Sequence, residues 1–79
     1  MTDDAPTDQH PTGRDWVTRF ARAIGQDDLS EQDVTALLDL AGVAAHSSER
    51  LAAPLACYLV GRAGMEPDAA LNLARSLFD

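Results

Sequence analysis

Side chains that could carry chemistry are few in this 79-residue chain, and they do not form a catalytic set. Cys57 is the only cysteine, and it lies among apolar residues of an expected helix, where burial raises a thiol pKa and suppresses its reactivity. The two histidines, His10 and His46, have no cysteine or second histidine at the spacing of a zinc site. No glycine-rich phosphate loop follows a strand. We therefore expect no catalytic, cofactor-binding or metal-binding residues, and a protein that is not an enzyme.

One compact polar run, residues 46–50, separates two strongly apolar segments. Its simplest interpretation is a connection between two helices, in which His46 complements the negative end of the first helix, a serine caps the second, and Glu49 and Arg50 lie in solvent. The alternative is a recognition edge, where these three side chains project beside Pro54 as a polar rim around an apolar patch. Arg50 is then the best single anchor, because its planar guanidinium pairs bidentately with carboxylates.

Trp16 allows a similar choice between core and interface. It begins an apolar stripe with Phe20 and Ile24, which recur every four residues. A single tryptophan on such a stripe usually belongs to the core, but beside a polar N-terminal tail it could also pack against a partner. The expected partner-binding residues are His46, Glu49, Arg50, Pro54 and Trp16.

Four short helices must position these residues, because Ala and Leu are abundant while aromatic and β-branched residues are few. The first covers 15–24, and the second follows a capping box at 30–33. The third covers 51–63, where a proline is tolerated in the first turn, and the fourth starts at Pro67. The sequence thus predicts an all-α fold, a compact bundle of four short helices.

The third helix is expected to be the centre of this bundle. Bulky side chains such as Leu55 and Tyr58 alternate with small ones around it, so nearly every side could be buried. Gly61 within the helix costs up to about 1 kcal/mol relative to alanine, which suggests the close approach of another backbone.

The remaining chain organisation is simple. Residues 1–12 are polar and acidic with little to bury, so we expect a disordered acidic tail. Residues 13–79 are expected to form a single four-helix domain, because a chain of this length has interior enough for one core.

Charge and composition narrow the classes of partner and the location. A formal net charge of −7 argues against nucleic acid and against an anionic membrane surface. A single cysteine permits no internal disulfide and fits a reducing compartment. The N-terminus lacks the basic and apolar regions of a secretory signal, and no run approaches the roughly 20 apolar residues of a membrane span. We expect a cytoplasmic protein.

Six short motifs stand out by their order and spacing. They are Asp15-Trp16-Val17, Leu37-Leu38-Asp39-Leu40-Ala41, Ala45-His46, Glu49-Arg50, Ala52-Ala53-Pro54-Leu55 and Tyr58-Leu59-Val60-Gly61. The pattern, over about residues 14–78, resembles a small actinobacterial domain family of unknown function. Members of that family occur as free-standing proteins of this size or attached to molybdopterin-guanine dinucleotide biosynthesis proteins. They are also found beside components of molybdenum-dependent formate dehydrogenase.

The resemblance implies a non-catalytic accessory protein or small subunit. Its larger protein partner would be a molybdenum cofactor-dependent oxidoreductase, with formate dehydrogenase as the first candidate, or the cofactor-loading machinery. That partner would carry the molybdenum cofactor, and this chain would bind none itself. Two alternatives stay open. One is direct participation in cofactor maturation, through sulfur relay by Cys57 or binding of the cofactor pyrophosphate by arginines. The other is a generic self-associating helical domain.

Overall fold

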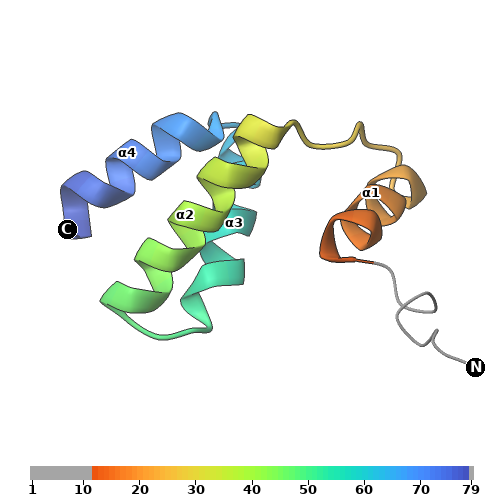
Figure 1. Cartoon of the computed structure of the whole chain (residues 1–79). Helices are drawn as coiled ribbons and strands as arrows, with labels where there is room; N and C mark the ends of the chain where they lie inside the picture. The colour runs from red at the N-terminus through yellow and green to blue at the C-terminus, as the bar shows by residue number, and fades with distance from the viewer. Residues whose placement is uncertain (1–11, 79) are drawn as a thin grey trace, which may run out of the picture.

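The computed structural model describes residues 12–78 and confirms the all-α fold with four helices (Figure 1). The helices are α1 (Gly13–Ala23), α2 (Glu31–Ser47), α3 (Ala52–Ala63) and α4 (Pro67–Phe78). The expected tail lies outside the described residues except for Thr12, whose hydroxyl accepts the backbone N–H of Asp15 at 3.0 Å and caps α1. Within residues 12–78, no helix combines the length and the apolar character that crossing a bilayer requires.

Local chemistry at the helix ends follows the sequence. The Ser30 hydroxyl accepts the backbone N–H of Asp33 at 3.0 Å, which confirms the expected cap of α2. After α1 and α3, the chain turns at Gly25 and Gly64, whose φ angles of 77° and 70° lie in the left-handed region that favours glycine. Helix α4 begins at Pro67, where a missing backbone N–H costs no intrahelical hydrogen bond.

Helix α2 is the centre of the fold. It packs against both α3 and α4, which lie beside it in Figure 1. The main buried cluster joins Leu40 on α2 to Ala70 and Leu71 on α4. Partly buried apolar side chains surround this cluster: Leu37, Val43, Val60 and Ala74.

The expectation that α3 is the central helix is wrong. Helix α3 contains no buried residue, and Leu55 and Tyr58 are exposed to solvent. A close approach at Gly61 is wrong too, because a Cβ there would meet no atom within 4 Å. The physical reason is that α3 has apolar side chains on all sides but lies along one side of α2, so most of that surface is left uncovered.

Helix α1 stands apart from the other three helices and makes little contact with them (Figure 1). Two polar contacts connect its turns to the start of α2 and the segment before it. Arg14 Nη1 lies 2.7 Å from Glu31 Oε2, and Thr18 Oγ1 donates to Asp28 Oδ2 at 3.0 Å. Both contacts lie on the surface, so they hold α1 only weakly.

The apolar stripe of α1 is not part of the core of the described chain. Trp16 is 56% exposed, and Phe20 and Ile24 are exposed to a similar degree. The ring centroids of Trp16 and Phe20 are stacked 5.1 Å apart, so the two side chains form one apolar surface. The core interpretation of Trp16 therefore does not hold within residues 12–78.

Candidate functional site

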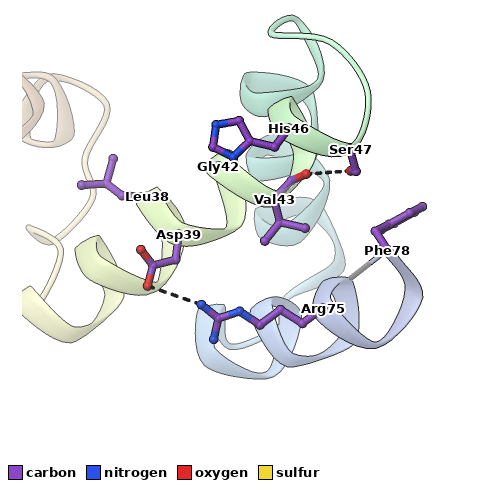
Figure 2. Close-up of a pocket in the computed structure, with 8 residues that line it drawn as sticks. All are labelled: Leu38, Asp39, Gly42, Val43, His46, Ser47, Arg75 and Phe78. Carbon is purple, nitrogen blue, oxygen red and sulfur yellow. Dashed lines mark hydrogen bonds and ion pairs between the residues drawn. The ribbon is translucent and has the colours of Figure 1, made fainter.

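A hollow lies between α2 and the C-terminal part of α4 (Figure 2). Its lining mixes apolar side chains with charged and polar ones. The lining residues are Leu38, Asp39, Gly42, Val43, His46, Ser47, Arg75 and Phe78. We call this surface the α2–α4 hollow.

One ion pair crosses the α2–α4 hollow. Arg75 Nη2 on α4 lies 4.0 Å from Asp39 Oδ2 on α2, and Figure 2 shows the two side chains reaching toward each other. Each side chain is about half exposed, so the pair contributes only about 0–1 kcal/mol to stability. A partner that offered its own charges could therefore separate the pair at little cost.

His46 occupies the last turn of α2 and is exposed at the edge of the hollow. Its place suits the negative end of the helix dipole. The two serines that follow end α2, Ser47 as its last residue and Ser48 as its C-cap. The Ser47 hydroxyl donates to the carbonyl of Val43 at 2.6 Å, and that of Ser48 to the carbonyl of Ala44 at 2.7 Å. A serine cap for the next helix is thus a wrong expectation, because α3 starts after Leu51 without a side-chain cap.

The remaining predicted rim residues lie apart from the hollow. Glu49 and Arg50 are exposed in the connection from α2 to α3, and Pro54 is exposed in the first turn of α3. None of these three lines the α2–α4 hollow, so His46 is the single member of the predicted edge that does. That His46, Glu49, Arg50 and Pro54 together form a recognition edge around an apolar patch stays a prediction.

An apolar groove adjoins the hollow at Ser47 and Phe78, which line both. We call it the α3 groove. Exposed large side chains form most of its surface: Leu51, Leu55, Leu59 and Phe78. Small residues of α2 and α3 complete it: Ala44, Ser48, Ala52 and Ala56. The predicted apolar patch near residues 46–54 therefore exists, but Asp39, His46 and Arg75 provide the neighbouring polar groups.

Trp16 belongs to a different surface. It lies on α1, which precedes α2, whereas His46 lies in the last turn of α2, at the far end of that helix (Figure 1). The 17 residues of α2 correspond to a length of about 25 Å. The five predicted partner-binding residues therefore do not form one site.

Cys57 is poorly placed for chemistry. Its Sγ lies 3.9 Å from the carbonyl oxygen of Leu37, and the side chain is partly buried between α3 and α2. Burial raises the pKa of the Cys57 thiol, which disfavours the reactive thiolate. Cys57 lines neither the α2–α4 hollow nor the α3 groove.

The charged groups of the described residues do not gather into an anion or metal site. Arg14 pairs with a glutamate, Arg62 lies 5.7 Å from the centre of the Tyr58 ring, and Arg75 pairs with an aspartate, on three different helices. Within residues 12–78, no three His, Cys, Asp or Glu side chains are placed to hold a metal ion.

Comparison with known proteins gives one result. No curated protein and no solved structure shows a significant match to the chain. A family model described as a domain of unknown function, DUF6457, matches residues 8–77, which is nearly the whole chain, and the protein therefore belongs to the DUF6457 family.

Proposed function

We propose that this protein is a non-catalytic binding module that docks onto a larger protein. The observation that supports the proposal is the balance between core and surface. Thirteen large apolar side chains of the described chain are exposed, while the buried core consists of Ala21, Ala36, Leu40, Ala70 and Leu71. Exposed apolar surface on this scale is typical of proteins that bury it against a partner.

The α2–α4 hollow together with the α3 groove is the surface that we assign to this partner. The α3 groove provides its apolar part, and Phe78 is shared by the groove and the hollow. Asp39, Arg75 and His46 stand at its edge and can pair with polar groups of a partner. An apolar centre with a polar rim is the usual composition of a protein interface.

The partner class rests on the sequence resemblance alone. The resemblance to the actinobacterial family points to a molybdenum cofactor-dependent oxidoreductase, formate dehydrogenase first, or to the proteins that load its cofactor. In this proposal the partner holds the cofactor, and the module contributes protein contacts in the cytoplasm, with Trp16, Glu49, Arg50 and Pro54 as further contact residues. The partly buried Cys57 favours this role over sulfur relay, because its thiol is held protonated.

The test is affinity purification of the tagged full chain from native cells, with mass spectrometry and molybdenum analysis of the bound proteins. We expect a molybdoenzyme or its loading factor to co-purify with the wild type. Leu55→Glu and Arg75→Glu should each abolish this co-purification. The first places a charge in the apolar α3 groove, and the second reverses the charge of a residue that lines the hollow.

Arg62→Glu is the matched control for Arg75→Glu, since Arg62 is an exposed arginine that lines neither part of the surface. The variant Arg50→Glu tests whether the connection from α2 to α3 also contacts the partner: loss of co-purification would show that it does. Capture that survives both Leu55→Glu and Arg75→Glu would refute the assigned surface. A partner without molybdenum or a role in its insertion would refute the partner class.

A further inference from the structure

Helix α1 turns its apolar stripe away from the rest of residues 12–78. The least exposed residues of α1 are Ala21, Val17 and Thr18 with Arg14, which define the side that its own chain covers. Successive residues of a helix are about 100° apart, so the stripe centred on Phe20 points roughly 100° away from Ala21. The stripe of an amphipathic helix normally faces a hydrophobic partner, and here none is supplied by residues 12–78.

A second apolar groove lies beside this stripe, between α1 and α2. Its lining is almost wholly apolar on the α2 side: Leu29, Val34, Leu37 and Leu38. From α1 and its cap come Thr12, Gly13, Arg14 and Val17. We call the groove and the adjoining stripe the α1–α2 face. It differs from the surface assigned to the larger partner, with which it shares only the edge residue Leu38.

The two segments at the α1–α2 face carry opposite net charges, so the basic segment of one copy can pair with the acidic segment of another. Residues 13–23 contain three arginines and one aspartate, a net charge of +2, and residues 26–33 contain four carboxylates and no basic residue, a net charge of −4. Arg19 and Arg22 form no ion pair with any residue of 12–78. The basic helix of one copy thus matches the acidic segment of another.

We propose that the α1–α2 face is the interface of a homodimer. The stripe of Trp16, Phe20 and Ile24 in each copy lies in the groove of the other, and Arg19, which borders this stripe, faces the acidic segment of the second copy. Such an interface is isologous, so each contact occurs twice. A second copy is the best-matched occupant, because it supplies both the apolar stripe and the opposite charge. Association of two copies depends on concentration, so dilution should return the monomer.

The single tryptophan makes the association visible. The full chain is diluted over a wide concentration range, and light scattering and Trp16 fluorescence are followed together. We expect the mass to double with rising concentration while the emission shifts to shorter wavelength, because Trp16 leaves water. A mass that stays monomeric would overturn the proposal, whether the emission is fixed or already blue-shifted by closure within one chain. A shift that appears only with anionic lipid vesicles would overturn it as well.

A matched pair of variants tests the stripe. Phe20 and Leu73 are both 49% exposed, the first on the α1–α2 face and the second on α4. Phe20→Glu should raise the dimer dissociation constant by at least about tenfold, and Leu73→Glu should leave it unchanged. Circular dichroism confirms that both variants fold. Equal weakening by both variants, or by neither, would contradict the assigned face.

A charge exchange tests the contact between copies. Alone, Arg19→Glu and Asp27→Arg should each dimerise more weakly, because like charges face each other across the interface. Mixed together, the two variants should form a heterodimer at least as strong as the wild-type dimer, since every contact again joins opposite charges. A mixture that associates no better than its components would refute this pairing. These experiments do not involve the larger partner, so their failure is distinct from failure of the proposed function.

Discussion

At the scale of single residues, Cys57 is the group whose chemistry the structure defines most clearly. Its thiol is partly buried against the Leu37 carbonyl, and burial raises its pKa above the ordinary value of 9.0. The folded chain therefore keeps the thiol proton at a pH where the unfolded chain has begun to lose it. Through this group, stability is fully present below the unfolded pKa and falls as pH rises toward the folded value.

We predict that Cys57 reacts with iodoacetamide more slowly in the native chain than in urea at the same pH. As pH is raised, the alkylation rate of the native chain should begin to increase at a higher pH than that of the unfolded chain. The reason is that only the thiolate is nucleophilic, and burial raises the pKa at which it forms. Cys57→Ala should leave the capture of a larger partner unchanged. Rapid alkylation of the native chain near neutral pH would show that the thiol is activated. Loss of the partner's enzyme activity with a folded Cys57→Ala variant that still binds it would favour the sulfur-relay alternative.

The candidate site could be predicted only where it depends on local sequence. His46 was identifiable because it ends an apolar helix and begins a polar run. Asp39 stands out as a carboxylate within an apolar stretch, but nothing local connects it to Arg75 or Phe78, which lie on another helix. These residues meet only because α2 packs on α4, and that packing depends on contacts distant in sequence.

At the scale of elements, the ends of the helices were predictable and their arrangement was not. A cap depends on a few adjacent residues, so Ser30, Gly25 and Pro67 marked their helix ends in the sequence. The apolar content of a helix did not predict which helix lies at the centre of the fold. Helix α3 is apolar all round, yet the longer α2 is the helix that contacts two neighbours.

We predict different costs for the loss of two similar caps. Ser30→Ala should lower the free energy of unfolding by about 1 kcal/mol, because it removes the cap of the central helix. Thr12→Ala should reduce the helicity of α1 with little effect on global unfolding, because α1 packs little against the rest. Urea denaturation and far-ultraviolet circular dichroism measure the two effects. Equal losses in global stability would show that α1 unfolds together with α2.

At the scale of the whole molecule, residues 12–78 have a small interior and two exposed apolar surfaces associated with α2. The α3 groove with the α2–α4 hollow involves the C-terminal part of α2, and the α1–α2 face lies at its start. An 8.4 kDa chain can bury only a limited share of its apolar side chains by itself. Stability and binding are therefore connected, because each partner that covers a surface also stabilises the fold.

The small core makes one side chain decisive for stability. Leu40 is 4% exposed at the contact of α2 with α4, whereas Leu38, two residues earlier on α2, is 67% exposed. Leu40→Ala should cost about 2–5 kcal/mol, because the buried site is left with a cavity. A domain of this size is typically stabilised by about 5 kcal/mol, so much of the variant should be unfolded without denaturant.

Leu38→Ala is the control for this prediction, since it removes the same atoms from an exposed position of the same helix. It should change the free energy of unfolding by no more than about 0.5 kcal/mol at a concentration where the chain is monomeric. Urea denaturation of both variants at one low concentration gives the comparison. Similar costs for the two substitutions would mean that Leu38 is covered in solution even in the monomer. Helix α1 would then close over α2, and the α1–α2 face would not be free for a second copy.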